Sequence, residues 1–464
     1  MPRRDVDTLR HGARRVAALL LALALAGLSL TGCGGKKDKP FTGQLTVWVA
    51  PPPGTADAAG NLPLGDAGSG PLVPIYRAAA AFEQAHPGVK VKVLSFGWPE
   101  LNARLAQALA GSDWAQQVPD VAAVSAQARP EPRWLGKGAL ESTTALLPAD
   151  EVKDTWPFAL EAFRDGGNLY GFPAWSTVQA LYLNLALFEA RGVTPPAGGQ
   201  WTFTEFARDV ARLTFVRADG TPVAGLGVPL RTGYYELWPL LYGGGARPLA
   251  PDGRSFALDQ PAGQQALERL VSLKSQTGSP WIGTDQVPDL FRAFADPALR
   301  TVAIVPWDSW ALDELERSSS LSAAPLKLGL ARYPSDGAPV PSIARAGGFV
   351  VFKESSPARR EAALALAKAL AGADVQQGLA ALGALPARSS LAKPESFSDP
   401  LRRQLAAMLP DAELPPHAPG WSKAEPALVG ELGAALAGRK TTAQALADAK
   451  KQVDAALAAA AATP

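Results

Sequence analysis

After residue 40 the chain alternates between two patterns of apolar and polar positions. Short runs rich in β-branched residues predict strands, and longer runs with apolar residues on one side predict helices. In chain order these are a strand at Leu45–Val49, a helix at Val73–Ala85, a strand at Val89–Val93, a helix at Pro99–Gly111 and a strand at Val118–Val124. Strand, helix, strand, helix, strand is the order of a mostly parallel α/β sheet.

The same patterns continue through the rest of the chain, and the helical one dominates after Pro357. Further strands are predicted at Ala180–Asn184, Ala303–Val305 and Gly348–Phe352. A Ser or Thr followed three residues later by Glu or Gln marks a helix start, because the two side chains cap the helix backbone reciprocally. Such pairs are Thr202 with Glu205, Ser422 with Glu425, and Thr441 with Gln444.

The beginning of the chain has a different pattern. Five arginines precede or adjoin an uncharged apolar stretch, Val16–Leu30, which leads into Thr31-Gly32-Cys33. A charged start, a short apolar body and a small-residue exit are typical of an export signal. The stretch is shorter than the roughly 20 residues that a membrane-spanning helix needs. We therefore expect residues 1–32 to be a signal peptide and the protein to act outside the cytoplasm.

Cys33 is the one cysteine of the chain. The small-small-Cys exit resembles the lipobox of bacterial lipoproteins, in which the thiol takes a diacylglycerol and the new amino end is usually acylated too. Two or three acyl chains form a stable anchor where one would not. The resemblance implies a lipid anchor in the cell membrane and a tether over residues 33–40. The alternative is a plain secretory signal with an incidental cysteine.

Removing the signal changes the charge of the chain. Residues 1–32 hold five of the 45 Lys and Arg residues and two of the 43 Asp and Glu residues. The rest of the chain therefore has 40 basic and 41 acidic residues. A nucleic-acid surface needs a basic excess, so no nucleic-acid partner is expected. The remaining part of the 464 residues is too long for one ordinary core, which predicts two lobes.

Twelve tryptophans are the most informative part of the composition, because an indole buries a large face and its N–H needs a partner. Several stand beside Pro, Gly, Ser or Asp, in contexts typical of loops and element ends, where binding residues gather. These are Trp98, Trp175, Trp307 and Trp421. By contrast, Trp48, Trp156 and Trp201 are interpreted as structural.

Motifs for catalysis and metal binding are few. Neither His86 nor His417 has a second ligand at helical or hairpin spacing, so no zinc site is expected. No nucleophile elbow, phosphate-cradling loop or dinucleotide fingerprint occurs in the sequence. Adjacent tyrosines such as Tyr234 and Tyr235 can bind ferric iron, but an iron site also needs acidic or imidazole ligands. Histidines are scarce in this chain, so an iron site is not favoured.

One group of acidic residues is a candidate catalytic site. Asp308, Asp313, Glu314 and Glu316 are close in sequence, and two carboxyl groups flanking a cleft suffice for glycoside cleavage. The plainer interpretation is a solvated helix face, since charge runs usually are. We expect no catalytic residue, no cofactor and no metal site.

Several segments in a fixed order carry a resemblance to one family. They are Leu45–Trp48, Phe82–Val91, Pro119–Val121, Gly167–Pro173, Leu181–Glu189, Trp201–Phe206, Gly243–Gly245, Gly347–Gly348 and Gly383–Pro386. Their order over nearly the whole exported part resembles the extracellular solute-binding proteins of ABC transporters, specifically the carbohydrate-binding family that includes maltose-binding protein.

The resemblance implies a type II periplasmic-binding fold. In that fold two α/β lobes are joined by three crossovers, and the ligand lies in the cleft between the lobes. By position, the crossovers would fall near residues 173–175, 345–349 and 385–389. One lobe would comprise residues 41–173 and 350–386, and the other residues 175–345 and 390–462.

A sugar has an apolar C–H face and a rim of hydroxyl groups, so an indole plane with polar groups around it suits a sugar. A buried hydroxyl left unpaired would cost about 1–3 kcal/mol. The family's stacking aromatics correspond by position to several residues here, and the crossovers add others. The ligand-binding candidates are Trp98, Trp175, Tyr235, Trp307, Trp310 and Trp421, with the polar residues Asp120, Gln127 and Glu236, and with Gly347 at a crossover.

Together these expectations describe a substrate-binding lipoprotein of an ABC importer. It would be a monomer that captures a sugar or oligosaccharide and docks on a membrane permease. Thr177 stands where the family has an acidic group, and the loop after the first strand is long, so the particular sugar stays open. The alternatives are a lipid-anchored glycan hydrolase, the same fold binding iron, a polyamine or a peptide, and a sensor partner of a membrane receptor.

Overall fold

The computed structural model describes residues 40–52, 70–126, 138–320 and 325–462. The chain divides into Met1–Phe41 and a compact unit, Thr42–Pro464. The expected signal peptide, Cys33 and all but the last residue of the tether lie outside the described residues. Among the residues that are described, no helix combines the length and the hydropathy needed to cross a membrane.

One mixed sheet of ten strands forms the centre of the compact unit. The strands lie in the order β2-β1-β3-β13-β6-β11-β8-β7, and β12 and β14 also pair with β6. Their bounds are β1 (Gly43–Val49), β2 (Val89–Ser95), β3 (Val121–Ala126), β6 (Phe172–Asn184), β7 (Phe215–Val216), β8 (Pro222–Leu226), β11 (Val302–Asp308), β12 (Leu328–Ala331), β13 (Ala344–Val351) and β14 (Leu385–Pro386). Two small ribbons pair β4 (Arg164–Asp165) with β5 (Asn168–Leu169), and β9 (Val228–Pro229) with β10 (Ile282–Thr284).

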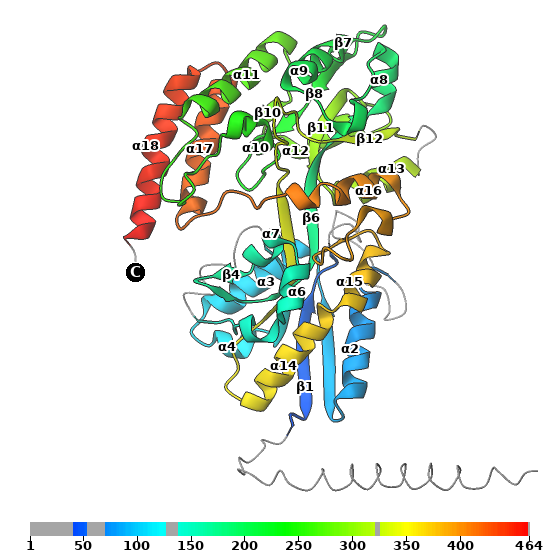
Figure 1. Cartoon of the computed structure of the whole chain (residues 1–464), viewed down its shortest axis with the longest axis vertical. Coiled ribbons are helices and arrows are strands. Elements are labelled where there is room, and N and C mark those ends of the chain that lie inside the picture. The colour runs from blue at the N-terminus through cyan, green and yellow to red at the C-terminus, as the bar shows by residue number, and fades with distance from the viewer. Residues whose placement is uncertain (1–39, 53–69, 127–137, 321–324, 463–464) are drawn as a thin grey trace, which may run out of the picture. The chain divides into compact units, whose positions relative to one another are not determined.

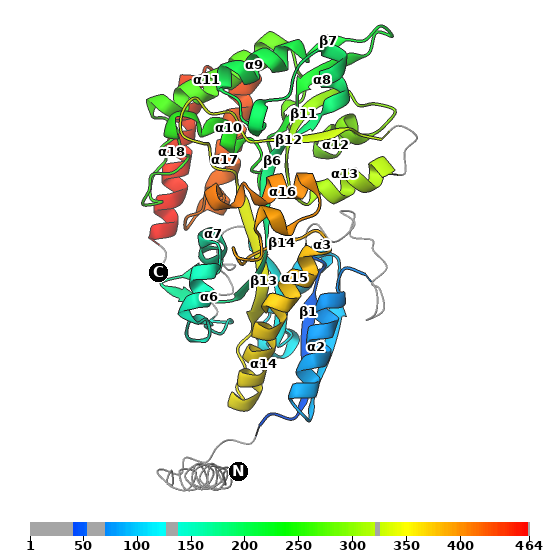
Figure 2. The same cartoon turned by 45° about the vertical axis from the view of Figure 1, so that its right-hand side comes forward.

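Strand β6 connects the two halves of this sheet (Figures 1 and 2). Its first residues pair with β13 and β14, whereas Gln179 to Asn184 pair with β11 and β12. All of its residues are buried, and most of them are apolar, although Ser176, Thr177, Gln179 and Asn184 are polar. We call the half that contains β1, β2 and β3 the first lobe, and the half that contains β7, β8, β11 and β12 the second lobe. The residue limits of the lobes stay a prediction.

The sheet is less parallel than the sequence pattern predicts. β1 is parallel to β2 and β3, and β8 is parallel to β11. Between these parallel pairs, β13 runs antiparallel to both β3 and β6, and β11 runs antiparallel to β6. The antiparallel centre arises because β6 and β13 bring the chain from one lobe into the other in opposite directions.

Helices of the first lobe cover its part of the sheet. In α2 the buried residues Ile75, Ala79 and Phe82 follow the spacing of one helix face, and that helix packs against α14 and α15. The helix ends where His86-Pro87-Gly88 turns the chain, with a φ of +94° at Gly88. The helices of this lobe are α2 (Val73–Ala85), α3 (Trp98–Ala110), α4 (Trp114–Gln117), α6 (Ala149–Asp154), α7 (Pro157–Glu161), α14 (Pro357–Leu370) and α15 (Ala373–Ala380).

The second lobe has its own core around Phe206, Trp238 and Leu267. The two C-terminal helices, α17 and α18, lie side by side on this lobe and contribute Leu428 and Val453 to that core (Figure 1). The helices are α8 (Leu185–Arg191), α9 (Phe203–Arg212), α10 (Trp238–Leu241), α11 (Pro261–Thr277), α12 (Val287–Ala295), α13 (Ala311–Ser320), α16 (Pro400–Ala406), α17 (Trp421–Leu436) and α18 (Thr442–Ala461). Short 3-10 turns lie at Thr144–Leu146, Ala197–Gly199, Gly243–Gly245, Pro394–Ser396 and Leu409–Asp411.

Two of the three expected capping boxes are confirmed, and the third is wrong. Thr202 and Glu205 cap α9, and Thr441 and Gln444 cap α18, each by reciprocal hydrogen bonds. Helix α17 instead begins at Trp421, after Gly420 in the left-handed region with a φ of +85°, so Ser422 does not cap it. The carboxylate of Glu425 is therefore free of any capping role and binds elsewhere, as described below.

Candidate functional site

Four polar side chains share one face of the sheet where β6 passes between the lobes. Thr177 and Gln179 lie on β6, and the register places Arg345 of β13 opposite Thr177 and Asp308 of β11 opposite Gln179. Directly opposed residues on antiparallel strands present their side chains on the same face. Tyr235, Glu236 and Glu425 are linked to these four by the contacts below, and we call all seven residues the polar cluster.

A buried ion pair holds the strands of the polar cluster together. Arg345 Nη1 lies 3.2 Å from Asp308 Oδ2, and the hydroxyl of Thr177 donates to the same oxygen at 2.8 Å. Only 1% of the Asp308 side chain and 14% of the Arg345 side chain are exposed. A charge pair this deep persists only where hydrogen bonds complete its shell, as the Thr177 hydroxyl does here.

Tyr235 and Glu425 border the guanidinium of Arg345. The guanidinium carbon lies 5.6 Å from the centre of the Tyr235 ring. The phenol of Tyr235 donates to Glu425 Oε2 at 3.3 Å, and the amide of Gly233 donates to Glu425 Oε1 at 2.8 Å. Burial raises the pKa of Glu425, and these two hydrogen bonds together with Arg345 partly oppose that rise. Burial also raises the pKa of Tyr235, which stays a phenol.

Glu236 is an incompletely compensated carboxyl group of the polar cluster. Its side chain is buried, and its Oε2 has no hydrogen-bond partner among the described residues. Burial raises the pKa of Glu236 to about 7, an effect that Asp308 strengthens and Arg345 opposes. The main-chain oxygen of Glu236 accepts a hydrogen bond of 3.2 Å from the phenol of Tyr333. The carboxyl group is thus poised between its neutral and charged forms near neutral pH.

Further polar atoms of the cluster also lack partners within the described part of the chain. They are both amide atoms of Gln179 and Nε of Arg345. A buried donor or acceptor left unpaired costs about 1–3 kcal/mol, and most native proteins hold only a few such groups. The unpartnered atoms of Gln179, Glu236 and Arg345 thus lie together on the face where β6 passes between the lobes.

Aromatic side chains adjoin the polar cluster on the first-lobe side. Trp175 lies two residues before Thr177 on β6 and therefore projects from the same face. The ring of Trp98 lies 6.2 Å from that of Trp175 at an angle of 58°, and its Nε1 donates to the main-chain oxygen of Pro51 at 2.8 Å. Trp175 is buried edge-on against Phe349, whereas Trp98 is only half-buried. We call Trp98 and Trp175 the indole pair.

Other candidates from the sequence lie at or near this site. Gly347 faces Trp175 across β13 and β6. Trp310 lies two residues after the end of β11, is half-buried, and its amide donates to Asp308 Oδ1 at 3.3 Å. Trp421 lies one turn before Glu425 on α17, with its ring 6.3 Å from that of Trp238. The structure therefore brings Trp98, Trp175, Tyr235, Glu236, Trp310, Gly347 and Trp421 to this region or its border.

The structure does not bring every expected residue to the polar cluster. Trp307 is buried inside the second lobe, with its ring 5.0 Å from Phe291 and 5.8 Å from Phe294. Because neighbouring strand residues point to opposite faces, the face that carries Asp308 excludes Trp307. Asp120 precedes β3, at the opposite end of that strand from the residue that pairs with Ala346 of β13. Arg359 binds both carboxylate oxygens of Asp120, at 2.7 and 3.0 Å, so Asp120 lies in an ion pair away from the polar cluster. Gln127 lies outside the described residues.

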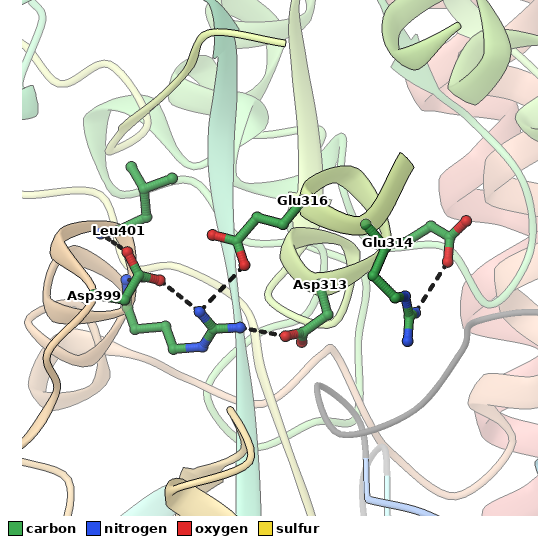
Figure 3. Close-up of polar contacts among 7 residues, drawn as sticks. Asp313, Glu314, Glu316, Asp399 and Leu401 are labelled. Atoms are coloured by element: carbon green, nitrogen blue, oxygen red, sulfur yellow. Dashed lines mark hydrogen bonds and ion pairs between the residues drawn. The ribbon is translucent and has the colours of Figure 1, made fainter. Parts of the chain in front are cut away.

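The acids considered for glycoside cleavage are dispersed among separate ion pairs. Asp313 and Glu316 of α13 both contact the guanidinium of Arg402 on α16, and Asp399 does so at 2.6 Å (Figure 3). Glu314 instead pairs with Arg317 at 3.1 Å. Burial raises the pKa of Asp313 to about 6, and Arg402 opposes the rise. These contacts join α13 to α16 within the second lobe, and Asp308 belongs to the polar cluster instead.

Sequence reasoning gave no binding role to Thr177, Gln179, Asp308, Arg345 or Glu425. Arg345 and Asp308 each carried a signal, since each is a lone charge at the end or start of an apolar strand. Such a charge is almost never buried without a partner. Within the described residues, no group of three or more His, Cys, Asp or Glu side chains is arranged to hold a metal ion.

The central strands of the sheet pass between two α/β lobes, and polar side chains gather where they pass. This arrangement defines the class of two-lobed ligand-binding proteins. The chain matches the family described as bacterial extracellular solute-binding protein over residues 77–404. The match spans well over half of its length, and the chain belongs to that family. No curated protein matches the chain.

Solved structures share this fold. An ABC transporter solute-binding protein from Thermotoga lettingae, bound with α-D-tagatose, has a TM-score of 0.69 at 23% identity and covers 89% of this chain and 99% of its own. The GacH receptor of Streptomyces glaucescens, solved with acarbose, has a TM-score of 0.68 at 22% identity, covering 90% and 99%. A cyclic α-maltosyl-1,6-maltose binding protein from Arthrobacter globiformis has a TM-score of 0.69 at 18% identity, covering 90% and 99%. The expected two-lobed α/β fold is confirmed.

Proposed function

We propose that this chain captures a carbohydrate outside the cytoplasm and delivers it to the permease of an ABC importer. The observation that carries the proposal is the set of unpartnered polar atoms on Gln179, Glu236 and Arg345 beside the indole pair. The half-buried indole of Trp98, which lies against the buried Trp175, suits the C–H face of a sugar ring, and the polar atoms suit its hydroxyl groups. Relatives of the same fold, crystallised with tagatose and with acarbose, support the choice of a sugar.

The position of the site suggests how capture would work. The polar cluster and the indole pair lie on strands that pass from one lobe to the other. A solute that binds both lobes stabilises the closed arrangement, because a ligand shifts a conformational equilibrium only by its difference in affinity for the two states. The closed form would then dock on the permease. A lipid on Cys33 would keep the protein at the membrane, and a monomer suffices for this cycle.

Binding without turnover is the second part of the proposal. The carboxyl groups of Asp313, Glu316 and Asp399 converge on the one guanidinium of Arg402. A glycosidase needs two carboxyl groups on opposite sides of the scissile bond. The ion pairing around Arg402 therefore argues against these three acids as a glycosidase pair.

Calorimetric titration of the exported chain with a panel of mono- and oligosaccharides tests the proposal. We expect at least one sugar to bind, and Trp98→Ala to weaken it by at least tenfold. Trp114→Ala changes a half-buried indole of the first lobe outside the indole pair and serves as the control, with unchanged affinity. Binding only of ferric iron, a polyamine or a peptide would overturn the sugar assignment, and sugar cleavage on incubation would overturn the binding-protein assignment.

Two further experiments address the anchor and the transporter. Mass spectrometry of the protein from membranes should find acyl chains on Cys33, and Cys33→Ala should release the protein from the membrane fraction. Uptake of the bound sugar by cells should require this chain together with a membrane permease. Normal uptake without the chain, combined with a lost signalling response, would support the sensor alternative instead.

A further inference from the structure

The polar cluster has more carboxyl groups than cations. Asp308, Glu236 and Glu425 are all at most 4% exposed, and they share the single guanidinium of Arg345 within the cluster. Charges at this depth act on one another strongly, because little water screens them. A solute that enters the cluster therefore meets more carboxyl groups than cations.

The carboxyl groups differ in how well the protein already satisfies them. Asp308 receives Arg345 and the hydroxyl of Thr177. Glu425 receives the amide of Gly233 and the phenol of Tyr235. Glu236 differs from both, because only the main-chain N–H groups of Tyr235 and Glu236 favour its carboxylate by hydrogen bonding, and its Oε2 has no partner within the described part of the chain.

Among the described residues, Arg345 is the cation that acts most strongly on the carboxyl group of Glu236. β11 contributes Asp308 and β13 contributes Arg345, while the segment after β12 contributes the phenol of Tyr333. Arg345 is already committed to Asp308 at 3.2 Å and to the main-chain oxygen of Gly233 at 3.5 Å. A carboxyl group in this setting accepts a cationic donor more readily than an anion or a second acid.

We propose that the solute carries a basic nitrogen, as an amino sugar or an amine-bearing oligosaccharide does, and that Glu236 binds its ammonium group. The inference rests on the proposed function, because it places a sugar at the polar cluster. An ammonium donor supplies up to three N–H groups, and a charge-assisted bond to a carboxylate is about twice as strong as one between neutral groups. The indole of Trp98 would cover the ring that carries the amine.

A matched pair of ligands tests the inference. Chitotriose carries free amines, and N,N′,N″-triacetylchitotriose has the same ring skeleton with each amine converted to a neutral amide. At pH 7 we expect calorimetry to show that the free amine binds at least tenfold tighter than the acetylated form. The variant Glu236→Gln keeps the shape of the side chain and should remove most of that preference. Glu413→Gln, a carboxyl of the second lobe paired with Arg247, is the control and should keep the preference.

The pH dependence supplies a readout that a merely structural role of Glu236 would not move. Burial raises the pKa of Glu236 to about 7, so the free protein gains a proton there as the pH falls. Binding an ammonium group requires the carboxylate, so chitotriose affinity should fall between pH 7 and pH 5.5, by up to about tenfold per pH unit. The fall should be absent in Glu236→Gln, and a thermal unfolding measurement of that variant checks that it is folded.

The outcomes separate the inference from the proposed function. If neutral sugars bind as tightly as chitotriose, or if Glu236→Gln keeps the preference for the amine, the inference is wrong and the proposed function stands. If no sugar of either kind binds while another solute does, the proposed function itself is wrong.

Discussion

The indole of Trp175 occupies the space in which a side chain of Gly347 would stand. A Cβ atom on Gly347 would lie 2.1 Å from both Cε2 and Nε1 of that indole. The two residues face each other on β13 and β6, so glycine at one position permits the orientation of the tryptophan at the other. Trp98 in turn lies against Trp175.

Gly347→Ala should therefore displace the Trp175 indole. We expect a loss of about 1–3 kcal/mol in the free energy of unfolding, as for other over-packed interiors, and a weaker affinity for the solute. Urea unfolding and calorimetry measure the two effects. Gly337→Ala is the control, because a Cβ there meets no atom within 4 Å, and it should leave both unchanged. Unaltered affinity in Gly347→Ala would show that the indole pair takes no part in binding.

Glu236→Gln should stabilise the protein at alkaline pH. The pKa of Glu236 is raised from 4.5 to about 7 on folding, so the folded chain binds more protons than the unfolded chain between those pH values. Stability is therefore lost as the pH rises through this window, by about 3 kcal/mol in full. Glutamine has no such proton, so the variant should be about 2–3 kcal/mol more stable than the parent at pH 8 and nearly equal at pH 4.5.

Urea unfolding at several pH values checks this result. Glu189→Gln is the matched control, because that carboxyl is exposed and pairs with Lys327 at the surface. A difference between parent and Glu236→Gln that does not change with pH would show that the carboxyl is not the titrating group.

Arg345→Met should destabilise the protein strongly. Removing the guanidinium leaves Asp308 buried with only the Thr177 hydroxyl and weaker contacts for compensation. Breaking a buried pair on one side costs about 3–5 kcal/mol. Arg292→Met breaks a pair with Asp289 in which both side chains are mostly exposed, and should change stability by less than about 1 kcal/mol. Equal losses in the two variants would contradict the buried role of Arg345.

Arg402→Met should loosen the contact between α13 and α16. Asp313, Glu316 and Asp399 would then face one another without the shared cation shown in Figure 3. We expect a loss of about 3 kcal/mol at pH 8 and a smaller loss at pH 5, where the acids take up protons. Arg104→Met, in an exposed pair with Glu100, is the control. A loss that is the same at both pH values would mean that charge is not its cause.

Local patterns predicted much of the secondary structure correctly. The expected helix Val73–Ala85 has the same bounds in the structure, because three apolar residues on one face and a Pro-Gly stop define it locally. The capping boxes of α9 and α18 formed for the same reason, since all their atoms lie within one helical turn. The Ser422 and Glu425 pair has the same spacing, yet Glu425 binds Gly233 and Tyr235, which lie about 190 positions earlier.

By itself, then, the sequence determined the local elements, the aromatic candidates and the resemblance to one family. Which candidates meet was decided by tertiary structure, because the polar cluster is assembled from strands far apart in the chain. Thr177 and Asp308, 131 positions apart, share a hydrogen bond only because β6 and β11 pair in one register. A shift of that register by one residue would turn Asp308 to the other face and Trp307 toward the cluster.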